Sequence, residues 1–260
     1  MSAQISDESA HDPIRIVPLY APENVHPTDT LAVPAVAANL TYRNGPLLSA
    51  VEVFTLFWGS AWNQPPQQGL VSQLNNFFDF ILTSALIDQL GEYSSGPYTI
   101  THGRLAGSAT ITAGGSPPRS LSDAALQAFL QRQITSGSAP KATPNTVYFI
   151  YVPPGVRVVM GGSASCQAFC GYHNAIDGKT FYAVMPYPAC TGCTGGLGAF
   201  DALTSTSSHE LCEAITDPIP GQGWYDDTHG EIGDICAWQT KKIGQYVVQL
   251  EWSNHASHCV

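Results

Sequence analysis

The sequence predicts an α/β or α+β fold with a mixed β-sheet, built as one domain over residues 38–260. The chain has 260 residues, which is enough for one large domain or two small ones. Apolar runs of strand length alternate along it with segments of helical periodicity, as in a sheet that is covered by helices. Neither an internal repeat nor a change of composition marks a linker after residue 37. A single folded unit is therefore the simplest architecture.

Six apolar runs have the length and composition of β-strands. They are rich in β-branched and aromatic residues and are bounded by glycine, proline or polar residues. The runs are Val51–Trp58, Tyr98–Thr112 as one or two strands, Asn145–Val152, Val156–Met160, Phe181–Met185 and Gly244–Trp252. The first run is especially dense in such residues and is expected to be a buried strand.

Helical periodicity marks a long central helix and a second, later helix. Apolar residues repeat with helical spacing from Pro66 onward, and Gly91 is a plausible stop, so the central helix is predicted over about 66–90. Ser122 has the side chain of an N-cap and predicts the second helix directly after it. The stretch 161–178 is rich in glycine, serine and cysteine and is expected to form a loop.

Residues 1–37 are polar, proline-rich and aperiodic, and are predicted to form a flexible N-terminal arm. Met1–Asp12 has neither the basic n-region nor the apolar h-region of a signal peptide. The protein is therefore expected either to be intracellular or to have lost an export signal. No run approaches the roughly 20 apolar residues of a membrane span, so no span is expected.

The balance of charge excludes some classes of partner. Charged residues make up 12% of the chain, against roughly 25% in an average soluble domain. The net charge is −10, which makes binding to nucleic acid or to an anionic membrane surface an unfavourable interpretation. Low charge together with abundant glycine, proline, serine and threonine is typical of many secreted, loop-rich proteins.

All seven cysteines lie from Cys166 onward. Cys190 and Cys193 form a CxxC pair, which leaves two alternatives, a structural zinc site or disulfide bonds. Disulfides are favoured because no second CxxC lies at a suitable spacing. Three short-range disulfides would leave Cys212 unpaired, and we expect it to be a buried structural thiol rather than a nucleophile.

The most informative segment is Thr206–Pro218, which has the sequence TSSHELCEAITDP and ends a helix predicted over about 199–216. Residues four apart on a helix lie on one face, about 5–6 Å apart at Cβ, so His209 and Glu213 can bind one metal ion. Glu210 lies where HExxH metallopeptidase helices carry their general base. Since Glu213 replaces the second histidine of that motif, the segment predicts a metal-site helix of the HExxE type.

Glu231 and Asp234 are the candidates for a third ligand. A catalytic zinc site needs three protein ligands, an open position and a base beside it. The two residues follow the helix after a long loop and would share one face of a short helical turn. We expect one to bind the ion and the other to orient His209, with the choice left open. This arrangement is similar to that of the gluzincin peptidases.

One imidazole and two carboxylates form a hard, anionic ligand set. We expect one zinc ion, with Mn²⁺ or Ca²⁺ as alternatives, although a histidine ligand argues against Ca²⁺. Such a site is expected to hydrolyse more slowly than an HExxH site. The competing interpretation is an ordinary amphipathic helix in which His209, Glu210 and Glu213 are solvated. For His173, a structural loop histidine is favoured over a ligand or a substrate contact.

Five short motifs are spread over residues 38–260. They are LTYRNGPLL (40–48), FWG (57–59), CGYH (170–173), SHELCEAITDP (208–218) and GEIGDIC (230–236). In combination they resemble the EXORDIUM / phosphate-induced protein family of plants and its microbial relatives. The fourth motif is similar to that family's HExxE helix, which ends in Asn/Asp-Pro.

The resemblance implies a fold and a metal centre more than a particular reaction. The six cysteines other than Cys212 match the family's set, which implies three disulfides and export. The plant relatives are secreted proteins tied to growth responses. Cys212 itself, where the family usually has a small residue, and the missing signal peptide depart from the family's pattern.

These observations lead us to expect a secreted, zincin-like metalloprotein. It would be a zinc-dependent peptidase or related hydrolase in which Glu210 acts as general base. Its substrate, a peptide or a cell-wall-associated molecule, would lie between the site helix and a sheet edge. The alternative is a non-catalytic extracellular module that uses the same ion for structure and binds partners in the cell wall.

Overall fold

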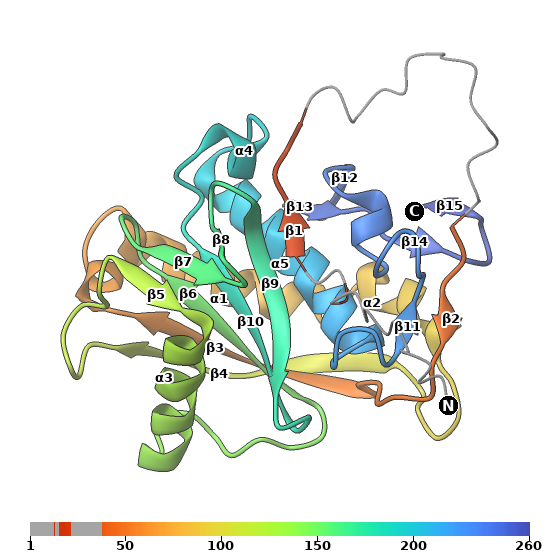
Figure 1. Ribbon diagram of the computed structural model, residues 1–260, viewed down its shortest axis with the longest axis horizontal. Coiled ribbons are helices and arrows are strands. Elements are labelled where there is room, and N and C mark those ends of the chain that lie inside the picture. The colour runs from red at the N-terminus through yellow and green to blue at the C-terminus, as the bar shows by residue number, and fades with distance from the viewer. Residues whose placement is uncertain (1–12, 14–15, 22–37) are drawn as a thin grey trace, which may run out of the picture.

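The protein is described by a computed structural model that covers residues 13, 16–21 and 38–260. Its centre is a mixed six-stranded sheet with the order β1-β9-β10-β6-β3-β4 (Figure 1). These strands are β1 (Ile16–Pro18), β3 (Ala50–Trp58), β4 (Thr101–Ile111), β6 (Thr146–Val152), β9 (Phe169–Ile176) and β10 (Thr180–Pro186). The four strands β10, β6, β3 and β4 are parallel, whereas β9 and β1 are each antiparallel to their neighbours. The expected mixed sheet is confirmed.

Helices cover both faces of this sheet (Figure 1). One face carries α1 (Gln67–Ile81), α2 (Ala85–Gln89) and α5 (Ala199–Thr216), and the other carries α3 (Asp123–Ser136). Alternate residues of β6 point to the two sides of the sheet. Val147, Phe149 and Tyr151 point toward α5, whereas Tyr148, Ile150 and Val152 point toward α3. Every residue of β6 is buried, as expected for a strand covered on both faces.

Short elements surround the central sheet. The helical ones are η2 (Ser60–Asn63), η3 (Leu90–Tyr93), α4 (Thr191–Thr194) and η4 (Asp234–Cys236). The strands pair as β2 (Thr41–Tyr42) with β11 (Trp224–Tyr225), β12 (Thr240–Ile243) with β13 (Tyr246–Gln249), and β14 (Trp252–Ser253) with β15 (His258–Cys259), while β5 (Ser120–Ser122), β7 (Arg157–Met160) and β8 (Ser163–Ala164) form a three-stranded sheet. Among them, β13 packs directly against α5.

Several predicted elements are confirmed closely. The apolar runs at 51–58, 145–152 and 181–185 are β3, β6 and β10, and the region 98–112 is one strand, β4. Ser122 caps α3, with its side chain accepting a hydrogen bond of 3.2 Å from the Ala125 N–H. The metal-site helix predicted over 199–216 has the bounds of α5.

The central helix predicted over 66–90 is wrong in its extent. It ends at Ile81, and a new helix begins after Ser84, whose side chain accepts a hydrogen bond from the Leu86 N–H. The two helical segments are bent by 50° relative to each other. Both bury apolar residues against the same core cluster, so the hydrophobic pattern continues across the bend and conceals the break.

Two regions predicted to be irregular contain strands. The expected loop 161–178 holds β8 and the whole of β9, which lies between β10 and β1 in the sheet. Its glycine and cysteine residues obscured the strand pattern. Within the predicted arm 1–37, Ile16–Pro18 form the edge strand β1, where Val17 is 2% exposed. The prediction of a flexible arm is therefore wrong for these three residues. Most of the other residues of the predicted arm lie outside the described part of the chain.

Six of the seven cysteines form disulfides. The pairs are Cys166–Cys190, Cys170–Cys193 and Cys236–Cys259. The first two join the start of β9 to the α4 region, so both cysteines of the CxxC motif are oxidised and the alternative of a structural zinc site there is wrong. Cys212 is unpaired and fully buried, as the sequence indicated. Three disulfides are typical of proteins from an oxidising environment.

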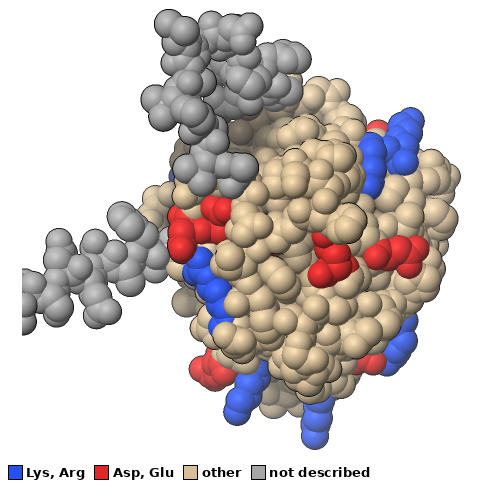
Figure 2. Space-filling model, turned by 90° about the vertical axis from the view of Figure 1, so that its right-hand side faces the viewer, with Lys and Arg blue, Asp and Glu red and all other residues tan. Residues whose placement is uncertain are grey.

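The surface carries few charges. On the face shown in Figure 2, isolated acidic and basic side chains are scattered over a mostly uncharged surface. Within the described residues, no single helix is long and apolar enough to cross a membrane. Only the bent pair of helical segments Gln67–Ile81 and Ala85–Tyr93 reaches that length and apolar content when the two are taken together.

The disulfide pattern predicts how many thiols react under each condition. The native protein should show no reactive thiol, because Cys212 is 0% exposed. Denaturant without reductant should expose this one thiol, and reduction should raise the count to all seven cysteines. Thiol titration together with mass spectrometry of alkylated protein measures each count. More than one thiol in the denatured, unreduced protein would contradict the pairing.

Candidate metal centre

The polar residues of the HExxE motif face the interior of the protein. His209, Glu210 and Glu213 are each 0% exposed, so the competing interpretation of a solvated amphipathic helix is wrong. His209 Nε2 lies 2.9 Å from Glu213 Oε1, one helical turn further on, yet neither atom has a hydrogen-bond partner. Two such atoms at this separation could both bind one cation.

Serine and threonine residues of α5 hydrogen-bond to the neighbouring strand β13. Thr204 Oγ1 donates a hydrogen bond to the Val247 carbonyl, and Ser208 Oγ accepts one from the Gln249 N–H. These small polar residues lie within the helix and do not cap it, because α5 already begins at Ala199. These hydrogen bonds to β13 fix the position of the helix that carries the HExxE residues.

Gly171 brings β9 against the opposite side of α5. A Cβ atom at this position would lie 2.7 Å from Thr206 Cγ2 and 3.2 Å from Glu210 Oε1, both closer than ordinary contact. Glycine therefore permits the close approach of strand and helix. Since residues two apart on a strand share a face, His173 also points toward α5.

His173 is a site residue that the sequence analysis underestimated. It is 1% exposed, and its Nδ1 lies 3.0 Å from Glu210 Oε2 and 3.4 Å from Glu213 Oε2. Its Nε2 lies 3.1 Å from the Asp217 carbonyl oxygen, which can only accept, so Nε2 carries the proton and donates it. Every residue from Phe169 to His173 is buried, so no apolar–polar alternation in the sequence marked His173 as a residue of the inner face.

Asp234 and Glu231 occupy different positions in the site. Asp234 Oδ2 accepts a hydrogen bond from the Glu231 N–H, which leaves Oδ1 3.9 Å from His209 Nε2. His209, Glu213 and Asp234 therefore offer three ligand atoms that all lie within 4.8 Å of one another. Glu231 faces His173 instead, with Oε1 3.5 Å from Nε2. Of the two candidates, Asp234 is the one grouped with the helix ligands.

Several buried polar atoms in this cluster have no hydrogen-bond partner. They are His209 Nδ1 and Nε2, Glu210 Oε1, both carboxylate oxygens of Glu213, both of Glu231, and Asp234 Oδ1. A buried polar group without a partner costs about 1–3 kcal/mol, and more if it is charged. So many in one place would be strongly destabilising unless a cation bound them, so the donor set fits a divalent ion.

Without a cation, burial and mutual charge displace the pKa values of these groups. Burial raises the pKa of Glu210 to about 7, although the hydrogen bond with His173 opposes it. Burial by itself lowers the pKa of His173, but its hydrogen bond with Glu210 and the negative charges of Glu210 and Glu213 outweigh this effect and raise the value to about 10. Burial likewise raises the pKa of Glu213, but the charge of His209 outweighs it and lowers the value to about 2.

Burial also disfavours the ionised forms of the acidic residues outside the helix, Glu231 and Asp234. Burial, followed by the charge of Glu213, raises the pKa of both Glu231 and Asp234 well above the usual range. Since metal ligands must be deprotonated, a bound cation would hold these groups in the ionised form. The other histidines near the C-terminus, His255 and His258, are exposed and take no part in the cluster.

Comparisons with known proteins add no assignment to this geometry. No protein-family model matches the chain, and no curated protein matches it. The chemistry of the site is therefore inferred from its own residues.

Gly233 offers a steric test of the site. It has an ordinary φ of −80°, yet a Cβ there would lie 2.8 Å from His209 Nδ1 and 2.9 Å from Glu213 Oε1. The Gly233→Ala variant should therefore displace two ligands and weaken zinc binding by about 10–100-fold, the range seen when residues supporting a metal site are altered. Competition with a chromophoric chelator measures the affinity.

The matched control is Gly91→Ala, where an added Cβ meets no atom within 4 Å. It should bind zinc as the wild type does. Equal affinity of Gly233→Ala and Gly91→Ala would show that the ion, if bound, lies elsewhere.

Proposed function

We propose that the protein is a zinc-dependent, peptidase-like hydrolase with a zincin-like arrangement of its site helix. The observation that carries this proposal is the set of buried, unpartnered ligand atoms of His209, Glu213 and Asp234, with Glu210 beside them. Structural sites close around their ion, whereas hydrolytic sites place a carboxylate next to it as general base. The HExxE order along α5 supplies such a carboxylate.

The ligand chemistry favours zinc over the alternatives. Zn²⁺ binds both imidazole and carboxylate ligands and is common in sites with three protein ligands. Ca²⁺ takes oxygen ligands and would leave His209 without a role. Mn²⁺ accepts the same carboxylates and is the closer alternative.

The protein's residues would divide the work of hydrolysis as follows. A bound zinc ion supplies a Lewis acid that polarises a carbonyl group and acidifies water. Glu210 would take up the proton released from that water, because its carboxylate lies beside the ligand atoms on the same helix. His173 orients the Glu210 carboxylate through their hydrogen bond of 3.0 Å and is itself anchored on the Asp217 carbonyl.

The outer edge of β9 supports a peptide as the substrate class. β1 pairs with it in antiparallel register, Ile16 opposite Tyr172 and Val17 opposite Gly171, and lies against α5. An extended peptide that paired in the same way would run beside the site, as in binding by strand addition. Because β1 occupies this edge, it would have to move aside for a substrate to enter.

Secretion is part of the same proposal. Three disulfides favour an oxidising compartment. The resemblance to the EXORDIUM / phosphate-induced proteins points the same way and supports peptides or cell-wall-associated molecules as partners.

A non-catalytic, metal-stabilised binding module is the second candidate. It is favoured by one observation, the complete burial of His209, Glu210 and Glu213. A catalytic ion needs a position open to substrate, whereas an ion used for stability does not.

The Glu210→Gln variant separates the two candidates. In a hydrolase it should lower kcat by about 10²–10⁴-fold, because the amide cannot accept the proton, while at least one zinc ion per chain remains. Glu92→Gln is the matched control, since Glu92 is exposed and accepts a hydrogen bond from the His255 N–H that an amide oxygen preserves. Activity on a peptide library and elemental analysis provide the two measurements. Unchanged activity in Glu210→Gln would exclude Glu210 as the base.

Removal of metal should destabilise the protein under either candidate. A ligand present at 100 times its dissociation constant stabilises the native state by about 2.7 kcal/mol. Since 1 kcal/mol shifts Tm by about 2–4 °C in a chain of this size, a chelator should lower Tm by roughly 5–10 °C. Calorimetry before and after chelation measures the shift, and added Zn²⁺ should reverse it. A wild type that lacks peptidase activity but shows this shift would favour the binding module.

A further inference from the structure

Glu213 belongs to two groups of ligand atoms, one on each side of its carboxylate. Its Oε1 lies 2.9 Å from His209 Nε2, and its Oε2 lies 3.4 Å from His173 Nδ1. Both oxygens are buried and neither has a hydrogen-bond partner. His173, Glu210 and Glu213 form a second set whose ligand atoms lie within 4.8 Å of one another.

We infer that the site binds two divalent cations, with the second held by His173 Nδ1, Glu210 Oε2 and Glu213 Oε2. Glu213 would then bridge the two ions through its two oxygens. This inference rests on the proposed function, because the first ion is the zinc held by His209, Glu213 and Asp234. Paired ions about 3.5–4 Å apart are a recurring device of hydrolases, in which they stabilise the attacking and leaving oxygens.

The orientation of His173 supports its role as a ligand. Its Nε2–H donates to the Asp217 carbonyl, so a cation that replaced the Nδ1 proton would meet the lone pair of Nδ1 directed toward the Glu210 carboxylate. Two acceptors 3.0 Å apart repel each other unless a proton or a cation lies between them. Histidines that bind metals characteristically donate their other ring N–H to a carboxylate or backbone carbonyl, as His173 does here.

The position of that carbonyl is itself fixed. The side chain of Asp217 accepts hydrogen bonds from the backbone N–H groups of Gly221, Gln222 and Gly223. Asp217 therefore ends α5 rigidly, and its carbonyl holds the His173 ring in the orientation a ligand needs.

The number of unpartnered carboxylate oxygens in the cluster also favours more than one cation. Four acidic side chains surround the two imidazoles, and Glu251, also fully buried with unpartnered oxygens, adds a fifth. Among the ion pairs of the described residues, none joins a lysine or an arginine to any of these carboxylates. A single divalent ion held by His209, Glu213 and Asp234 would leave other buried carboxylate oxygens of the cluster without a partner, and a second ion would bind some of them.

A second ion remains compatible with Glu210 as general base. Only Oε2 of Glu210 faces His173, whereas Oε1 has no hydrogen-bond partner. One oxygen can therefore bind the ion while the other takes up a proton. The ligand set of the second site, one imidazole and two carboxylates, suits Zn²⁺ or Mn²⁺.

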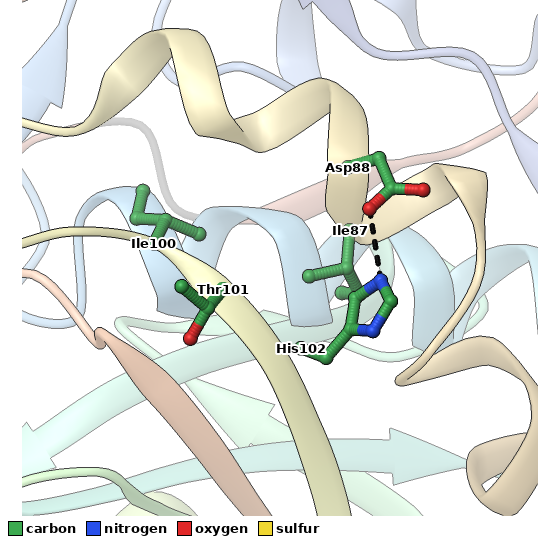
Figure 3. A pocket seen from close by; sticks show the side chains of 5 residues that line it. All are labelled: Ile87, Asp88, Ile100, Thr101 and His102. Carbon is green, nitrogen blue, oxygen red and sulfur yellow. Dashed lines mark hydrogen bonds and ion pairs between the residues drawn. The ribbon is translucent and has the colours of Figure 1, made fainter.

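A surface histidine–carboxylate pair provides a control outside the cluster. His102 Nε2 lies 2.8 Å from Asp88 Oδ1 beside an open pocket of about 390 Å³ (Figure 3). Both side chains are about half exposed or more, and Ile87, Ile100 and Thr101 supply the rest of the lining. One imidazole and one carboxylate in contact with water do not make a closed metal site.

The metal content of the purified protein tests the inference. Protein equilibrated with Zn²⁺, and separately with Mn²⁺, is freed of unbound metal and analysed by elemental mass spectrometry. The wild type should hold two ions per chain. His173→Gln and Asp234→Asn should each hold one, and His102→Gln should still hold two.

The outcomes distinguish the two proposals. One ion in the wild type would overturn the second site and leave the proposed function standing, whereas none would overturn both. Two ions in both wild type and His173→Gln would overturn the assignment of His173. Electron paramagnetic resonance of the Mn²⁺-loaded wild type provides a second test, which does not depend on whether the variants fold. A bridged pair gives an exchange-coupled spectrum, and the six-line signal of isolated Mn²⁺ would contradict the bridge.

Discussion

Carboxylates that are cut off from water must be neutralised where they lie, and this requirement governs the centre of the molecule. α5, β9 and the segment after β11 bring acidic side chains and two imidazoles together at nearly complete burial. Packing alone cannot satisfy their oxygens, because carboxylates only accept hydrogen bonds and few donors are within reach. A divalent cation, as we propose, would supply the missing positive charge without a hydrogen bond. The proposed chemistry follows from that electrostatic need.

The scaffold holds these groups together by close approach on three sides. Gly171 allows β9 to approach α5, and Gly233 allows the next loop to approach His209. The serine and threonine residues of α5 hydrogen-bond to β13 on another side. Two disulfides tie the start of β9 to the α4 region, and a third ties η4, which begins at Asp234, to β15. Each ligand-bearing element is thus restrained, as a preorganised metal site requires.

Burial has opposite consequences for stability and for catalysis. Low polarity around the site strengthens the attraction between a cation and its ligands, but a substrate must still reach the ion. The strand β1 is the described element best placed to control entry, because its described residues Ile16–Pro18 cover the β9 edge. A short edge strand has few interactions to lose when it leaves. In a hydrolase, β1 would have to leave the β9 edge to admit a substrate, whereas in a binding module it could stay in place.

The sequence by itself determined the strands of the parallel sheet, the capped helix α3, the extent of α5 and the HExxE residues, because these depend on local periodicity and capping. It did not reveal the break between α1 and α2, since both helices bury the same apolar pattern. Nor did it place His173 beside Glu210, or choose Asp234 over Glu231 as the neighbour of His209. Those contacts join segments far apart in the chain, and only the packing of β9 and η4 against α5 brings them within reach.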